Sequence, residues 1–213
     1  MKMKIGVFFG GKSVEHEVSV ISALQAVPFF DRSKYDVVPA YISKEGAMYV
    51  GDEVGRIEEY RDIPRLIAKS RRVVGVQEGG RFLLVRYPMK RFGSSVESAI
   101  DVAFPIVHGT NVEDGALQGY FRTMSVPFVG CDVTASAVGM DKSVTRAVLK
   151  DAGIPTWDSR SVFVKSFFRD TEKILREIEN EFPFPLIVKP FNLGSSIGIK
   201  KAFSTAELKE ALE

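Results

Sequence analysis

The first part of the chain alternates apolar and polar blocks in a strand–loop–helix–strand order. Residues 5–9 form a short apolar run that ends at two glycines, which predicts a buried strand. Residues 17–27 place apolar side chains on one helical face, and residues 35–42 form a second apolar run. This order is typical of the opening of a parallel α/β sheet.

The pattern continues with shorter elements up to residue 130. The sequence GVQEGGRFLLVR predicts a hairpin that turns at residues 78–80. Further along we expect a buried strand at 101–107, a helix at 116–124 and a short strand at 127–129.

The pattern changes near Cys131, where a second, α+β domain is expected to begin. We therefore divide the chain into domains 1–130 and 131–213. Ser204 and Glu207 have the spacing of a capping box that opens a last helix. The other elements predicted here are a helical stretch at 133–152, a strand at 160–164, an amphipathic helix at 172–181, and strands at 186–189 and 197–201.

Composition indicates an ordinary globular protein. The 213 residues are 45% hydrophobic and 26% charged, with a net charge of +2, so the total charge does not point to a polyanionic partner. The single cysteine excludes an intrachain disulfide and fits a reducing compartment. We find neither a signal peptide nor an apolar run long enough to cross a membrane, so we expect a cytoplasmic protein that binds no membrane.

Residues 56–91 contain ten Arg and Lys against four Asp and Glu, which is a candidate nucleic-acid surface. Acidic residues and prolines interrupt this stretch, and we see no stacking aromatic residues along it. A solvated face is the favoured interpretation, and no nucleic-acid partner is predicted.

The loop FGGKSVEHEVS at residues 9–19 lies between the first strand and the first helix, a position that often receives an anion. Its spacing is neither GxGxxG nor GxxxxGK[ST], so it predicts neither a dinucleotide site nor a P-loop. Glu15 and Glu17 would repel phosphate and suit a substrate ammonium group better. Taken alone, the loop is interpreted as a plain structural turn, with a ligand-binding loop as the alternative.

Three further residues are candidates for contact with a ligand. His108 follows a buried strand, at the edge where α/β sheets place ligands, although a lone histidine is often structural. Lys142 begins a helix, and taken alone it is interpreted as a surface lysine. Lys189 ends the run LIVK directly before the loop PFNLGSSIG, and a lysine followed by a glycine–serine loop is a layout suited to phosphate. Gly194 would let that loop approach a ligand closely.

Taken together, four segments resemble the D-alanine–D-alanine ligase family of the ATP-grasp superfamily. They occur in that family's order and spacing, and the resemblance covers the whole chain: GGKSVEHEVS, HGTNVEDGALQG, MDKSVT and VKPFNLGSSIGI. The resemblance implies a Rossmann-like, pre-ATP-grasp parallel-sheet domain followed by the first part of an α+β ATP-grasp domain. It also implies an enzyme that joins two D-alanines with ATP and Mg²⁺ for peptidoglycan synthesis, and a homodimer formed through the first domain.

The resemblance implies roles for the matching residues. Glu15 matches the glutamate that holds the ammonium of the first D-alanine, Val18 an apolar neighbour of that substrate, and His108 a histidine beside the substrate carboxylates. Lys142 and Lys189 match two lysines that reach the phosphates of ATP.

The loop at residues 193–196 matches the family's loop over the phosphates, which adds Gly194 and Ser196 to the ATP-binding residues. Ser195 matches a serine that hydrogen-bonds the counterpart of Glu15. We therefore predict Glu15, His108 and Ser195 as catalytic residues.

The family's metal ligands, ribose-binding acid, phosphate-binding arginine and second-substrate loop lie in a later portion that this sequence lacks. We therefore assign no metal-binding residue, and we expect a truncated ligase that does not turn over by itself. D-alanine-dependent release of ADP by the pure chain would refute this. The alternatives are a non-catalytic binding or dimerisation module and a related ligase that uses D-lactate or another second substrate.

Overall fold

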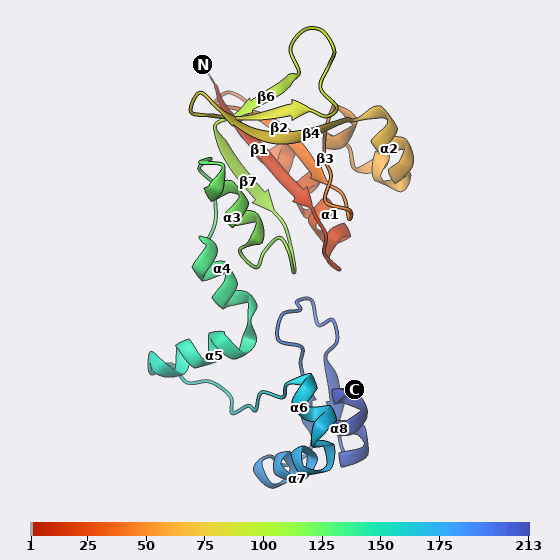
Figure 1. Cartoon of the computed structure of the whole chain (residues 1–213), viewed down its shortest axis with the longest axis vertical. Helices are drawn as coiled ribbons and strands as arrows, with labels where there is room; N and C mark the ends of the chain where they lie inside the picture. The colour runs from red at the N-terminus through yellow and green to blue at the C-terminus, as the bar shows by residue number, and fades with distance from the viewer. Residues whose placement is uncertain (1) are drawn as a thin grey trace. The chain divides into compact units, whose positions relative to one another are not determined.

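The computed structural model describes residues 2–213, and the chain forms two compact units, Met1–Met140 and Asp141–Glu213, called unit 1 and unit 2 below (Figure 1). Helix α4 (Val133–Met140) belongs to unit 1, where Val133 lies against Gly115. The compact units therefore divide ten residues after the predicted domain boundary at 130. The boundary between functional domains stays a prediction.

Unit 1 is built on one seven-stranded sheet with the strand order β6-β5-β4-β3-β2-β1-β7. β1 pairs in parallel with β2 and with β7, as the α/β pattern predicts, and the remaining neighbours are antiparallel. The sheet is therefore mixed. Its strands are β1 (Met3–Gly10), β2 (Tyr35–Ile42), β3 (Met48–Val50), β4 (Arg71–Glu78), β5 (Arg81–Arg86), β6 (Val96–Ile100) and β7 (Val102–Ile106).

Two cores cover the opposite faces of this sheet, because successive side chains of a strand point to opposite sides. Val7 and Phe9 of β1 pack with Leu24 of helix α1 (His16–Ala26). Phe8, between them, packs on the other face with Phe121 of helix α3 (Ala116–Thr123), at a ring distance of 4.8 Å. Helix α2 (Ile63–Lys69) and the 3₁₀ turns η1 (Val27–Phe29), η2 (Glu53–Gly55) and η3 (Ile57–Arg61) complete the unit.

The hairpin at residues 78–80 is confirmed, since β4 and β5 pair from Val73 with Arg86 to Glu78 with Arg81. The predicted strand at 127–129 is reduced to one bridge between Ala103 and Phe128. The sequence reading missed β3, β6 and α2, which are short and lack a clear period.

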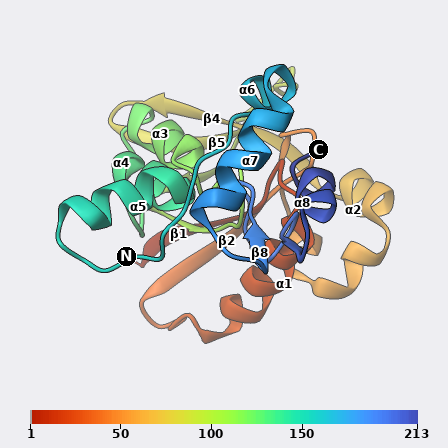
Figure 2. The ribbon, with the colours of Figure 1, turned by 90° about the horizontal axis from the view of Figure 1, so that it is seen from below.

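Unit 2 packs three helices against a two-stranded sheet. Phe167, Leu175, Ile178, Ala202 and Leu208 form its buried core. Helices α7 and α8 lie side by side in it (Figure 2). The elements of unit 2 are α5 (Lys142–Asp151), α6 (Val164–Arg169), α7 (Thr171–Glu181), β8 (Leu186–Val188), β9 (Lys200–Ala202) and α8 (Thr205–Leu212).

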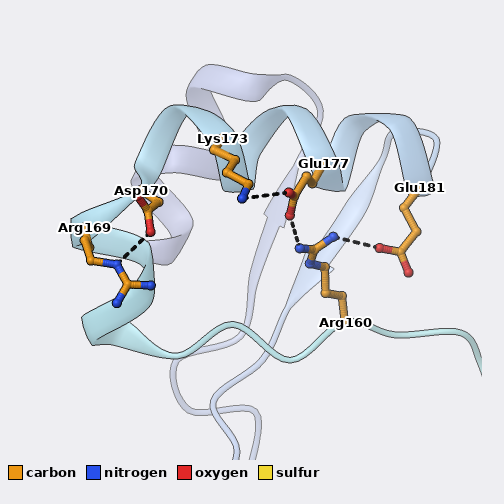
Figure 3. A network of polar contacts seen from close by, with 6 residues as sticks. All are labelled: Arg160, Arg169, Asp170, Lys173, Glu177 and Glu181. Atoms are coloured by element: carbon orange, nitrogen blue, oxygen red, sulfur yellow. Dashed lines mark hydrogen bonds and ion pairs between the residues drawn. The ribbon is translucent and has the colours of Figure 1, made fainter.

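The predicted strand at 160–164 is wrong. The segment is extended but joins no ladder, and α6 already begins at Val164. Arg160 instead reaches across to α7, where its guanidinium pairs with Glu177 and, at 3.2 Å, with Glu181 (Figure 3). Side-chain ion pairs thus connect α7 to a segment that was predicted to be a strand.

The helical stretch at 133–152 is broken at Asp141. The Asp141 carboxylate accepts hydrogen bonds from the backbone N–H groups of Ser143 and Val144, as an N-cap residue does. A new helix, α5, therefore begins at Lys142. No helix within residues 2–213 combines the length and the apolar composition needed to cross a bilayer.

The predicted cap of the last helix is present, and its removal should be measurable. Ser204 Oγ accepts a hydrogen bond from Glu207 N at 3.3 Å, and the Glu207 carboxylate accepts one from Phe203 N at 2.9 Å. Ser204→Ala should lower the free energy of unfolding of unit 2 by about 1 kcal/mol. Urea unfolding followed through NMR signals of α8 tests this. The exposed Ser159, outside any helix, provides the control variant Ser159→Ala, and an equal loss in both variants would contradict the capping role.

Candidate functional site

The site in unit 1 lies where β1 and β7 end. These parallel strands finish at one edge of the sheet, and each leads into a loop, called the first loop (residues 11–15) and the second loop (residues 107–115). Ser19 on α1 joins both strand ends, because its Oγ accepts from Gly10 N at 2.7 Å and donates to Ile106 O at 2.5 Å. The edge is therefore fixed before any ligand binds.

The two loops contact each other directly. Asn111 Nδ2 donates to Lys12 O at 3.0 Å, and Val112 packs so closely on Gly11 that a Cβ there would lie 2.4 Å from its Cγ1. Within the second loop, Gly109 N donates to the Glu113 carboxylate at 2.9 Å. These contacts make one structured surface from segments almost a hundred residues apart.

Glu15 sits at the junction of the loops. It is 6% exposed, and its backbone N–H donates to Ser13 Oγ at 3.1 Å. A Cβ built on Gly109 would lie 2.7 Å from Glu15 Oε2 and 2.3 Å from Ser13 Oγ. A largely buried carboxylate at such a sheet edge is suited to an ammonium group, because burial makes a charge of opposite sign favourable.

His108, in the second loop, and Val18, on α1, belong to the same sheet edge as Glu15. The half-buried His108 ring has Nε2 3.3 Å from Ser22 Oγ on α1. Val18, also on α1, has a 48% exposed side chain. The structure thus brings Glu15 and His108 to one edge and leaves Val18 accessible beside them.

Lys142 in unit 2 contacts the glycine–serine loop. Its ammonium donates to Leu193 O at 2.5 Å and to Phe191 O at 3.4 Å, and its backbone N–H also donates to Phe191 O, at 3.1 Å. The neighbouring Asp141 has its pKa lowered, chiefly by the hydrogen bond from the Ser143 hydroxyl. Lys142 is therefore part of a built arrangement, which the surface-lysine alternative does not explain.

The loop after β8 turns at its serines. Ser195 and Ser196 both have positive φ, 47° and 61°, whereas Gly194 is absent from the positive-φ residues. The left-handed backbone of this loop thus lies at its two serines, and the close approach of Gly194 to a ligand stays a prediction. Lys189 lies directly after β8 and is exposed.

The hydrogen bond between Ser195 and Glu15 and the absence of metal-binding residues both stay predictions. The hydrogen bond would join residues of different units. Within residues 2–213, no group of three or more His, Cys, Asp or Glu side chains is arranged to hold a metal ion.

The structure adds residues that the sequence reading missed. His16, next to Glu15, is 3% exposed and hydrogen-bonds the first loop. Tyr41 on β2 lies against it. The sequence signal that could have identified His16 is its place directly after Glu15 in the motif SVEHEVS.

The basic stretch at 56–91 does include an exposed aromatic residue, contrary to the sequence reading. Tyr87 is 51% exposed, with the Arg72 guanidinium 5.0 Å from its ring centre. Arg71 in the same stretch is paired with Glu97 at 2.7 Å. The absence of a nucleic-acid partner stays a prediction.

Comparison with known proteins gives one consistent family. A family model described as "D-ala D-ala ligase N-terminus" matches residues 4–131, and one described as "D-ala D-ala ligase C-terminus" matches residues 148–213. Similar curated proteins include the D-alanine–D-alanine ligase of Chlorobium limicola, 40% identical over 100% of this chain and 58% of that protein. The one from Thermosipho melanesiensis is 36% identical over 99% of this chain and 55% of that protein.

Solved structures agree with this match. A D-Ala:D-Ser ligase, VanG from Enterococcus faecalis, aligns with a TM-score of 0.78 and 32% identity over 100% of this chain and 59% of its own. The D-alanine–D-alanine ligase from Coxiella burnetii aligns with a TM-score of 0.79 and 30% identity over 99% of this chain and 59% of its own. The chain therefore spans between 55% and 59% of the length of these relatives.

Proposed function

The chain belongs to the D-alanine–D-alanine ligase family, and from this premise we propose that it binds D-alanine through unit 1 and the phosphates of ATP through unit 2. The observation that supports this best is Glu15, 6% exposed at the junction of the loops that follow β1 and β7. A carboxylate in this place pairs with the ammonium of an amino acid.

The reaction proposed for the whole protein has two steps. A carboxylate oxygen of the first D-alanine attacks the γ-phosphorus of ATP, the bond from that phosphorus to the bridging oxygen breaks, and ADP leaves. The amine nitrogen of the second D-alanine then attacks the acyl carbon, inorganic phosphate leaves, and the nitrogen loses a proton. Both steps depend mainly on positioning and on neutralising charge.

In unit 1, the proposed roles follow the geometry of the sheet edge. Glu15 holds the substrate ammonium, and Val18 offers an exposed apolar contact beside it. His108, hydrogen-bonded to Ser22 on α1, is placed to meet the substrate carboxylates.

In unit 2, the lysines and the loop are proposed to hold phosphate. The ammonium of Lys142 has three N–H groups, two of which are directed at Leu193 O and Phe191 O, so one donor remains for a phosphate oxygen. Lys189, Gly194, Ser195 and Ser196 supply charge and donors along the loop, and Ser195 is further proposed to steady Glu15.

The resemblance also implies Mg²⁺. The part of the chain that the structure describes offers no group of ligands for it, so we give no residue of this chain a metal-binding role and assign it no step. A homodimer formed through unit 1 and a cytoplasmic location complete the proposal. Both are supported by the family resemblance, and sedimentation at twice the monomer mass tests the dimer.

D-alanine is proposed as the second substrate, because the curated relatives are named for it. D-serine is the second candidate, since a ligase named for it is 32% identical and covers the whole chain.

Binding to the 213-residue chain tests the proposal. In NMR titrations, D-alanine should shift the backbone amides of the first and second loops, and ATP should shift those of residues 189–196. L-alanine is the matched control and should act far more weakly. Amide shifts of equal size with both enantiomers, or none in these loops, would contradict the proposed site.

A further inference from the structure

His16 is a buried histidine beside Glu15 to which the proposed reaction gives no role. It is the first residue of α1 and is 3% exposed. Its ring lies between the first loop and β2, where it meets the Tyr41 ring edge-on at 5.5 Å between centroids. A buried ring with two nitrogens needs a partner for each of them.

The contacts of the ring define its tautomer. His16 Nδ1 lies 2.7 Å from Gly11 O, and a carbonyl oxygen only accepts hydrogen bonds, so the proton is on Nδ1. His16 Nε2 lies 3.1 Å from the Tyr41 hydroxyl. In a neutral ring Nε2 is an acceptor, so the hydroxyl donates to it.

Tyr41 is suited to act as that donor. It is 1% exposed. Burial, helped by the charges of Glu45 and Glu17, raises its pKa to about 12, so the phenol keeps its proton near neutral pH. Both ring nitrogens of a neutral His16 are then satisfied.

These bonds fix Gly11 on two sides. Its N–H donates to Ile42 O at 2.7 Å, and its carbonyl accepts from His16. The turn is tight, because Gly10 has a φ of +87° and a Cβ there would lie 2.3 Å from Ile42 O and 3.0 Å from His16 Cε1. His16 therefore anchors one end of the first loop to β2, and Glu15 is the other end.

We propose that His16, as the neutral Nδ1–H tautomer, is a positioning residue that holds the first loop so that Glu15 meets the substrate ammonium. His16 itself touches no substrate. The inference rests on the proposed function for the identity of the ligand, and on the contacts of Gly11 and Tyr41 for the geometry.

The tautomer is tested directly by NMR on the intact 213-residue chain labelled with ¹⁵N. The sequence has two histidines, and His108→Gln assigns their signals. His16 should show the Nδ1–H pattern, with Nε2 as the acceptor. An Nε2–H pattern would overturn the inference.

The positioning role is tested with a pair of tyrosine variants. Tyr41→Phe keeps the ring and removes the hydroxyl. Tyr49→Phe is the control, since Tyr49 lies 6.3 Å from the Tyr41 ring and is not the tyrosine hydrogen-bonded to His16. Tyr41→Phe should weaken D-alanine binding about fivefold, the factor expected for one lost hydrogen bond, and speed hydrogen exchange of the first-loop amides. His16→Ala should weaken D-alanine binding further than Tyr41→Phe does. His16→Asn, which keeps an N–H near the Nδ1 position, should recover part of that lost affinity.

Two outcomes keep this inference distinct from the proposed function. If the unaltered chain binds no D-alanine while Tyr41→Phe still loosens the first loop, the proposed ligand is wrong and His16 keeps its role in holding the loop. If Tyr41→Phe and Tyr49→Phe show the same hydrogen exchange of the first loop and the same D-alanine affinity, the inference is overturned whatever the ligand.

Discussion

Gly109→Ala is expected to weaken D-alanine binding by about 10- to 30-fold, which corresponds to roughly 1.4–2 kcal/mol. A Cβ at this position would lie 2.7 Å from Glu15 Oε2 and 2.3 Å from Ser13 Oγ. The first loop must move to make room, and the Glu15 carboxylate moves with it. A hydrogen bond to a charged group contributes about 1.5–3 kcal/mol, so a displaced carboxylate loses most of that contribution.

A second glycine separates this effect from backbone strain. Gly109 has a φ of +84°, where alanine costs about 1–2 kcal/mol in any surroundings. Gly130 has a φ of +112°, and a Cβ added to it would meet nothing within 4 Å. Gly130→Ala should thus share the loss of stability but keep D-alanine affinity, measured by calorimetric titration. Equal affinities in the two variants would show that contact between the loops does not position Glu15.

Lys142→Met is expected to weaken ATP binding by about 30- to 150-fold, the factor for roughly 2–3 kcal/mol. Methionine keeps the apolar stem of lysine but cannot donate to Leu193 O, at 2.5 Å, or to Phe191 O. The variant loses both the proposed phosphate contact and the anchor of the loop that carries Ser195 and Ser196. Backbone amides of residues 191–196 should therefore shift even without nucleotide.

Lys150→Met provides the matched control for this prediction. Lys150 is an exposed lysine in the last turn of the same helix, α5. It should leave ATP affinity within about twofold of the unaltered chain, since surface substitutions rarely exceed about 0.5 kcal/mol. Fluorescence titration with a labelled ATP analogue measures both variants. A similar loss of affinity in the two would refute a specific role for Lys142.

Local sequence was enough to predict the helices and strands that have a strong apolar pattern. β2 matches its predicted range, and β1, α1, α3 and α7 differ from theirs by one or two residues at an end. Their apolar positions repeat with the period of a strand or a helix, and glycines or prolines mark several of their ends. The capping box at Ser204 was also predicted correctly, because its hydrogen bonds join residues only a few positions apart.

Elements whose pairing depends on distant partners were predicted less well. β3 has three residues and pairs on both sides with antiparallel neighbours. Its strand conformation comes from ladders that no local pattern reveals. At residues 160–164 the error was the opposite one: a strand was predicted, yet within residues 2–213 neither sheet includes this segment.

Residue types and spacing, together with the family resemblance, predicted which residues could act: Glu15 and His108 after two parallel strands, and Lys142, Lys189 and the glycine–serine loop further on. How these residues are held became clear only in the folded chain. The fold packs Glu15 against Gly109, ties His16 to Tyr41, and joins Lys142 to Leu193, 51 positions away. The reason is that chemical type and local spacing are properties of the sequence, whereas hydrogen bonds between distant segments form only when the sheet and the loops bring those segments together.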